Sequence, residues 1–146
     1  YYGDEIGMAA NHDKGDGAMR ANFPGGFADG QPNAFTAEGR DCLQTAYFDF
    51  TRRILNWRKG NTALSEGKLT QFTVQNGVYV YARTSKDRHV VVILNGKKEA
   101  RTLNLTHYAE VLPTTTAYNV FTQQQTSWDK ELTLEPRGIM ILDFDK

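Results

Sequence analysis

The sequence has one cysteine, three histidines and no net charge over its 146 residues. A single cysteine excludes an internal disulfide, and His12, His89 and His107 lack the spacing of a zinc site. No apolar run approaches 18 residues, so the sequence predicts no membrane-spanning helix. Because 17 basic residues balance 17 acidic ones, no basic face is expected and no nucleic-acid partner is predicted.

Apolar residues make up 40% of the chain and charged residues 23%, which is typical of a globular protein. Residues 1–36 are rich in Gly, Asn and Asp and predict a long loop, and loops of this length tend to be functional. The segment Asp13-Lys-Gly-Asp-Gly17 does not meet the ligand spacing of a calcium loop. We therefore expect no metal site.

Residues 37–58 carry the pattern of an amphipathic helix. Apolar side chains recur at spacings of three and four along one face: Leu43, Tyr47, Phe50, Ile54 and Trp57. Thr36 is the expected N-cap, and Cys42 is expected to pack against the apolar face as an inert residue. Such a large aromatic stripe must cover another apolar surface.

Short strand patterns dominate the rest of the chain. Asn76-Gly77 separates two such runs, which is a strong signal for a tight hairpin. The run Val90–Leu94 is continuously apolar and predicts a central strand. Further candidate strands cover residues 101–105, 109–112, 117–121, 131–134 and 139–144. These features predict a mainly β fold, an antiparallel two-sheet Greek-key sandwich over residues 61–146.

Several segments resemble the α-amylase family of glycoside hydrolases. Tyr2-Gly-Asp-Glu-Ile-Gly-Met8 resembles the end of its eighth barrel strand, and residues 13–20 and 23–27 resemble a loop of its neopullulanase and cyclomaltodextrinase-like members. Residues 52–64 resemble the last barrel helix and its exit. The resemblance implies that residues 1–60 are the end of a truncated (β/α)8 barrel and that residues 61–146 are the family's C-terminal domain.

The resemblance also implies site residues. Gly3, Asp4 and Glu5 would lie at the mouth of the barrel, where such enzymes gather their active sites. Their alternative role is that of solvated loop residues.

Asp16 and Arg20 keep the four-residue spacing that the family uses to line its donor-side subsites, so we expect both to bind substrate. A carboxylate accepts hydrogen bonds from sugar hydroxyls, and a guanidinium donates several in a fixed fork. A local ion pair that braces the loop is an equally weighted alternative, and Asp13 could take the place of Asp16 in the alignment.

The chemistry of the family needs a nucleophile and an acid/base carboxylate. It also uses a third Asp, and no Asp or Glu of this chain matches these positions. We therefore expect no catalytic residue in this chain and no cofactor. The expected partners are an α-glucan in the parent enzyme and the missing upstream barrel, and the resemblance is compatible with a periplasmic or secreted location.

The resulting hypothesis is the C-terminal part of a glycosidase that hydrolyses α-glucans such as starch, maltooligosaccharides, pullulan or cyclodextrins. One alternative is a carbohydrate-binding β-sandwich module, which would need an exposed aromatic platform, and Trp128 in the polar segment 123–130 is its main candidate. Another is a domain that only supports its barrel. The helix stripe presents too much apolar surface for one sandwich edge, so we expect the isolated chain to self-associate, or residues 1–36 to be poorly ordered.

Overall fold

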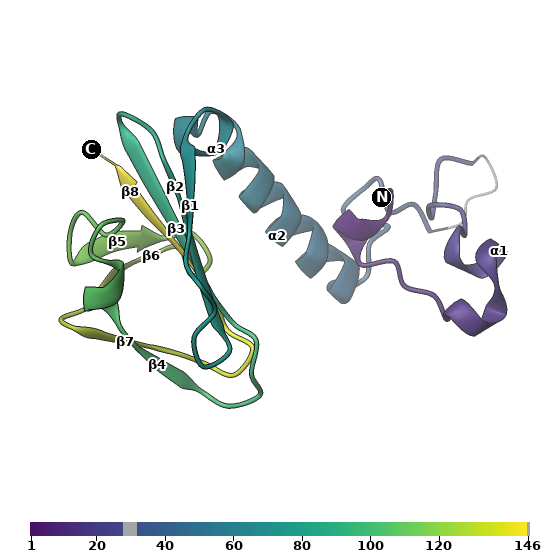
Figure 1. The fold of residues 1–146 in the computed structure, drawn as a ribbon. Helices are drawn as coiled ribbons and strands as arrows, with labels where there is room; N and C mark the ends of the chain where they lie inside the picture. The colour runs from purple at the N-terminus through teal and green to yellow at the C-terminus, as the bar shows by residue number, and fades with distance from the viewer. Residues whose placement is uncertain (28–31, 146) are drawn as a thin grey trace. The chain divides into compact units, whose positions relative to one another are not determined.

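The computed structural model describes residues 1–27 and 32–145 (Figure 1). The chain divides into two compact units, residues 1–56 and residues 57–146. The domain boundary expected after residue 60 stays a prediction. Residues 28–31 of the expected loop lie outside the described residues.

The first unit holds three short helical turns and most of one long helix. The 3-10 turns η1 (Asp4–Ile6) and η2 (His12–Lys14) precede α1 (Asp16–Met19), a single turn of α-helix. The long helix α2 runs from Cys42 to Arg58, and its last two residues belong to the second unit. The described part of the predicted loop is therefore a series of short turns joined by irregular backbone.

The structure places the start of α2 at Cys42 rather than at residue 37, so the predicted start and the Thr36 cap are wrong. Asp41 caps the helix instead: its Oδ1 accepts from the amide of Gln44 at 2.8 Å, and Gln44 Oε1 accepts from the amide of Asp41 at 3.0 Å. This reciprocal pair is a capping box, which satisfies two backbone donors at once. Cys42 is exposed, so its predicted packing is also wrong.

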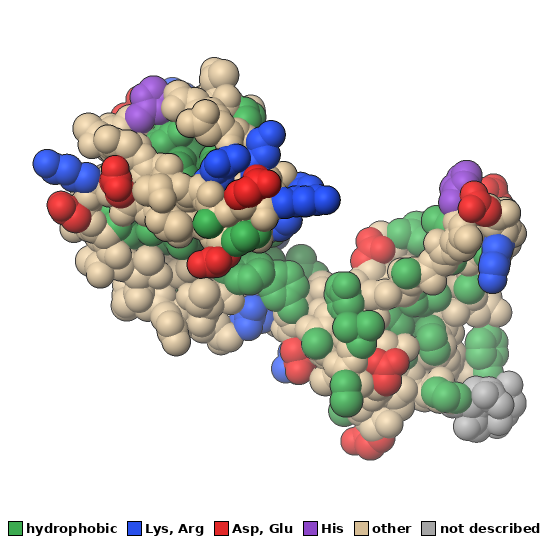
Figure 2. Space-filling view, turned by 90° about the horizontal axis from the view of Figure 1, so that it is seen from below, with side chains coloured by type: hydrophobic (Ala, Val, Ile, Leu, Met, Phe, Trp, Pro, Cys, Tyr) green, Lys and Arg blue, Asp and Glu red, His purple; other side chains and the backbone are tan. Residues whose placement is uncertain are grey.

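The first three residues of the predicted apolar stripe of α2 are exposed, whereas Ile54 and Trp57 are half-buried. Leu43 is 66% exposed, Tyr47 46% and Phe50 38%, and Leu55 on the same helix is 58% exposed. Figure 2 shows hydrophobic side chains in green scattered over the surface of the molecule, among tan and charged groups. An amphipathic helix of this kind normally buries its apolar face, so the exposed part of the stripe on α2 is available to a partner surface.

The second unit is an antiparallel sandwich. Its elements are α3 (Thr62–Ser65), β1 (Lys68–Gln71), β2 (Val78–Thr84), β3 (Arg88–Asn95), β4 (Arg101–Asn104), η3 (Leu105–Tyr108), β5 (Thr116–Asn119), β6 (Gln124–Ser127), β7 (Glu131–Leu134) and β8 (Ile139–Asp145). Six strands form one sheet in the order β1-β2-β3-β8-β5-β6, and β4 pairs with β7 in a second, two-stranded sheet. The predicted mainly β sandwich is confirmed.

Two strand predictions are wrong. Residues 109–112 form turns after η3, with the amide of Val111 bonded to the carbonyl of Tyr108 at 3.0 Å. Tyr108 and Val111 are both buried, so the side chains of this segment belong to the hydrophobic core although its backbone forms turns. Strand β6 was missed because its residues are polar and mostly exposed, so they show no alternation of apolar side chains.

The hairpin predicted at Asn76-Gly77 is confirmed. Asn76 has φ 50° and Gly77 has φ 78°, and the flanking Gln75 and Val78 exchange backbone hydrogen bonds of 3.1 and 2.8 Å. Positive φ at both central residues defines the type I′ turn, whose twist matches that of paired strands.

Strand β3 is buried on both faces. Val91 and Ile93 join the core between the two sheets, where they share a cluster with Leu103, Leu132 and Leu134 of the small sheet. On the opposite face Val90 and Val92 pack with three neighbours from the helical segment: Trp57, Ala63 and Leu64. This double burial explains why the strand reads as a continuous apolar run in the sequence.

A buried carboxylate joins the end of α2 to the large sheet. Asp143 of β8 is 4% exposed, and its oxygens accept from Arg88 Nε at 2.8 Å and Arg88 Nη2 at 2.6 Å. The Trp57 indole N–H donates to the same carboxylate. The carboxylate is thus satisfied by a bidentate guanidinium and an indole, as a buried charge requires.

We expect Asp143→Ala to lower the free energy of unfolding of the second unit by about 3 kcal/mol, because it removes the carboxylate that accepts from the Arg88 guanidinium and the Trp57 indole N–H. Urea denaturation followed by tryptophan fluorescence measures this change, since both tryptophans, Trp57 and Trp128, lie in the second unit. Glu99→Gln is the matched control because it breaks the exposed Glu99–Arg101 pair and should cost under about 1 kcal/mol. Equal losses in the two variants would contradict the role of Asp143.

Candidate functional site

The candidate site begins at the tight turn of residues 3–7. Gly3 is buried and adopts φ 91°, a left-handed conformation that favours glycine. Its amide donates to Glu5 Oε2 at 2.8 Å, and the side chain of Asp4 accepts from the Tyr1 nitrogen at 2.8 Å. Residues 4–6 form η1, so the expected strand end is a 3-10 turn in the structure, and within residues 1–27 and 32–145 no strand pairs with it.

Two glycines allow close packing around this turn. A Cβ on Gly3 would overlap the side chain of Met8, and one on Gly7, which has φ 67°, would overlap the ring of Tyr47. Gly7 thereby lets the turn approach α2 closely. The turn is fixed by packing inside the first unit as well as by its own hydrogen bonds.

Tyr2 joins this turn to the Asp16–Arg20 segment. Its hydroxyl lies 3.3 Å from the carbonyl oxygen of Arg20 and 3.2 Å from that of Ala21, and it donates to them. Partial desolvation, together with the neighbouring Tyr1, raises the pKa of the Tyr2 phenol above its ordinary value. The structure thus brings the two predicted site segments together through a residue to which the sequence analysis gave no role.

Asp16 and Arg20 form an ion pair. Arg20 Nη1 lies 3.3 Å from Asp16 Oδ2 across the single turn of α1, and both side chains are largely exposed. The alternative of a local ion pair is therefore present in the structure. The backbone amide of Asp13 donates to Asn11 Oδ1 at 2.9 Å, and Asp16 is the carboxylate that pairs with Arg20.

The exposed groups of this site can exchange hydrogen bonds with a ligand. The Asp16 carboxylate and the Arg20 guanidinium can accept from and donate to ligand hydroxyls at one time. Among residues 1–27 and 32–145, no group of three His, Cys, Asp or Glu side chains is placed to hold a metal ion. The described helices include none long and apolar enough to cross a membrane.

Trp128, the candidate aromatic platform, lies against the core. It is partly buried and packs on the sandwich core, with its ring edge-on to Phe144 at a centroid distance of 6.1 Å. A ring held in this way stabilises the loop before β7. The sequence could not distinguish this position from an exposed one, because the segment around Trp128 is polar.

The described folds match solved structures of glycosidases. An α-amylase from Geobacillus thermoleovorans, complexed with acarbose, aligns over 100% of this chain and 29% of its own, with a TM-score of 0.67 and 19% identity. The cyclic α-maltosyl-(1→6)-maltose hydrolase of Arthrobacter globiformis aligns over 99% of this chain and 26% of its own, with a TM-score of 0.64 and 20% identity. The chain thus spans less than a third of either relative, and at these identities the likeness concerns the fold.

A family model gives the more specific match. The model of the cyclo-malto-dextrinase C-terminal domain matches residues 69–143, just over half of the chain. The matched segment runs from β1 into β8 and so includes both sheets of the sandwich. The predicted resemblance to α-amylase-family glycosidases of the cyclomaltodextrinase group is confirmed, and the chain belongs to the cyclomaltodextrinase C-terminal domain family.

Proposed function

We propose that this chain is the C-terminal part of a glycosidase that hydrolyses α-glucans, in which the sandwich supports the catalytic barrel. The observation that carries the proposal is the order of the segments: the family match over residues 69–143 follows a helix and a turn motif that resemble the end of the family's barrel. The exposed stripe of α2 supports it, because such a face needs a partner surface. Starch, maltooligosaccharides, pullulan and cyclodextrins are the candidate substrates, and a periplasmic or secreted location is part of the proposal.

Within this proposal, Asp16 and Arg20 bind substrate hydroxyls at the barrel mouth, beside Gly3, Asp4 and Glu5. The ion pair supports this role, since a guanidinium held 3.3 Å from a carboxylate is oriented before a ligand arrives. The hydrogen bonds of Tyr2 support it further by tying Arg20 to the Gly3 turn. The largely exposed side chains remain accessible to a sugar.

The catalytic carboxylates belong to the missing part of the parent. Retaining hydrolysis needs two carboxyl groups about 5–5.5 Å apart on either side of one bond. The Glu5 carboxylate accepts from the Gly3 amide, so its hydrogen bond stabilises the turn. The role of a carbohydrate-binding module is less well supported, because its candidate platform Trp128 packs against Phe144.

In the parent enzyme we expect Asp16→Ala and Arg20→Ala each to lower kcat/KM on maltooligosaccharides about tenfold or more, because each removes a hydrogen bond to a charged group. Steady-state kinetics on maltotriose and maltohexaose measures the effect. Asp49→Ala and Arg52→Ala are matched controls, since this exposed pair on α2 has the same 3.3 Å separation. Unchanged kinetics in both site variants, or equal losses in the controls, would refute the assignment.

The 146-residue chain alone should hydrolyse none of these glucans, whereas the parent should. Side-by-side assays of reducing-end release from starch, pullulan and cyclodextrin measure this difference. Asp4→Asn and Glu5→Gln serve as diagnostic variants. Turnover by the chain that either variant abolishes would place catalysis in this segment and sink the proposal.

The isolated chain should self-associate through the stripe of α2. Replacing Leu43 and Phe50 together by Ser should shift it toward the monomer in sedimentation velocity, because both side chains are exposed and apolar. Val74→Ser is the control, since Val74 is 56% exposed in the second unit. A wild-type chain that stays monomeric at high concentration contradicts this expectation.

A further inference from the structure

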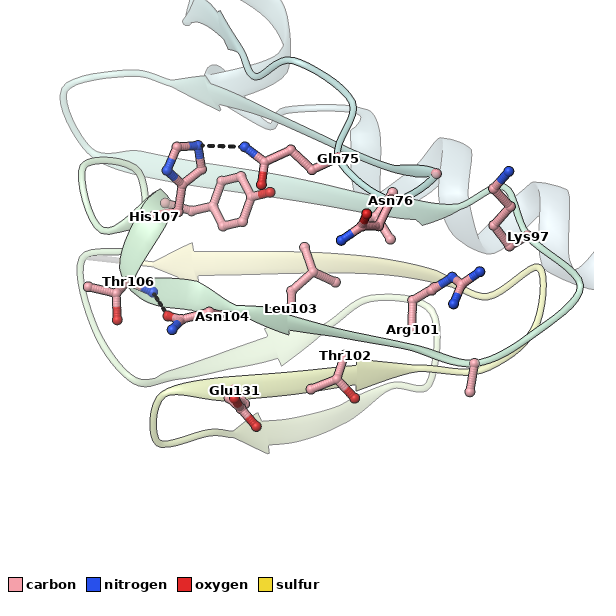
Figure 3. A pocket seen from close by; sticks show the side chains of 14 residues that line it. Gln75, Asn76, Lys97, Arg101, Thr102, Leu103, Asn104, Thr106, His107 and Glu131 are labelled. Carbon is pink, nitrogen blue, oxygen red and sulfur yellow. Dashed lines mark hydrogen bonds between the residues drawn. The ribbon is translucent and has the colours of Figure 1, made fainter.

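A groove runs along strand β4 in the second unit (Figure 3). Its volume is about 1280 Å³. Strand β4 forms one wall, and the β1–β2 turn with Gln75 and Asn76 lies across from it, while His107 closes one end and Lys97 stands near the other. All of its lining residues belong to the sandwich, outside the proposed sugar site.

The wall formed by β4 is a free strand edge. In the part of the chain that the structure describes, strand β4 pairs with β7 alone, with Thr102 opposite Thr133 and Leu103 opposite Leu132. The amide of Leu105 donates to the carbonyl of Lys130 at 2.8 Å, which fixes the alternation along the strand. By this two-residue period, the backbone groups of Leu103 bond to β7, whereas those of Thr102 and Asn104 point away from it.

The lining of the groove favours a polypeptide over a sugar. Its apolar floor includes Leu103, which is 7% exposed, and Val78, which is 2% exposed. The one aromatic ring among its lining residues other than His107 is that of Tyr108, which is 3% exposed and packs edge-on to Phe72 at 4.9 Å. A sugar ring therefore finds no open aromatic face to stack on. An extended peptide needs backbone donors and acceptors that point outward from a strand edge, as the N–H and C=O of Thr102 do by this register.

The charges along the groove favour one orientation of a bound peptide. Lys97 and Arg101 line one end, and Glu131, paired in register with Asn104, lines the other. Arg101 makes only a 3.5 Å contact with the exposed Glu99, and its buried Nε has no hydrogen-bond partner among the described residues. The guanidinium therefore keeps donors for a further acceptor. In antiparallel pairing with β4, the carboxyl end of an added strand lies at the Arg101 end.

We propose that this groove binds a single extended peptide that adds antiparallel to β4, with an acidic residue or a free carboxylate beside Lys97 and Arg101. Charges beside a free edge discourage sheet-to-sheet pairing, so the flanking basic side chains disfavour the edge of a second sheet as the occupant. The proposal does not depend on the proposed glycosidase function.

The probe is a labelled hexapeptide that alternates Val and Thr, begins with Lys and ends with Glu and a free carboxylate. Fluorescence anisotropy with the full 146-residue chain should show saturable binding. Thr102→Pro should weaken it about fivefold or more, because proline removes the backbone N–H that faces the groove.

Thr133→Pro is the matched control. By the register, its N–H faces the far edge of β7, and both variants lose the same 2.8 Å contact between the Thr102 and Thr133 hydroxyls. It should therefore leave peptide binding near the wild-type value. Circular dichroism of both variants verifies that the sandwich is intact.

A second pair of measurements does not depend on folding of the proline variants. Methylating alternate backbone nitrogens of the probe, on the face that pairs with β4, should abolish binding by the wild-type chain. Arg101→Gln and Lys97→Gln should each weaken the probe that ends in Glu several-fold, and should leave unchanged a probe that ends in Gln-amide.

Three results would overturn the proposal: undiminished binding of the methylated probe, equal weakening by Thr102→Pro and Thr133→Pro, or no saturable binding of the unmodified probe. Maltohexaose provides the alternative occupant. Displacement of the peptide by maltohexaose, or binding of maltohexaose that Arg101→Gln abolishes, would assign the groove to glucans instead.

Discussion

The carboxylate of Asp143 holds the second unit together at the point where helix meets sheet. It lies on β8, accepts both hydrogen bonds of the Arg88 fork from β3, and receives the indole N–H of Trp57 from the end of α2. A buried charge is tolerated only with such partners. The apolar contacts of Val90 and Val92 with Ala63 and Trp57 lie on the same face of the sheet. Within the second unit, Trp57 is therefore held on the sheet by its hydrogen bond to Asp143 and by the apolar contacts around it.

Two kinds of element were predictable from the sequence: turns whose backbone needs particular residue types, and strands whose burial leaves an apolar pattern. The Asn76-Gly77 turn required positive φ at two residues, and only a few residue types tolerate it. Strand β3 was predictable because burial on both faces produces an unbroken apolar run. Strand β6 was not, since a polar edge strand is stabilised by its pairing with β5 and leaves no apolar pattern. Residues 109–112 have the apolar pattern of a strand but form turns, and their apolar side chains are buried from those turns.

Part of the candidate site was likewise predictable from the sequence, and part was not. The spacing of Asp16 and Arg20 predicted that the two side chains belong together, and the turn of α1 places them 3.3 Å apart. Which ligand they bind is not contained in that spacing. The link through Tyr2 could not be predicted, because its partners are backbone carbonyls of Arg20 and Ala21, which any residue would provide. The register that frees the edge at Thr102 is likewise a property of the paired strands.

The place of β8 in the sheet bears on how the chain folds during synthesis. Strands β2 and β3 are neighbours in sequence and can pair early, but β3 and β5 are joined only through β8, which begins at Ile139. Until that segment has left the ribosome, β3 has one unpaired edge and the apolar residues around Leu142 are missing from the core. Pairings between distant segments form slowly, and unpaired edges invite association with other chains. A nascent chain of this family is thus most exposed to aggregation, and to chaperones, in the interval before residues 139–145 emerge.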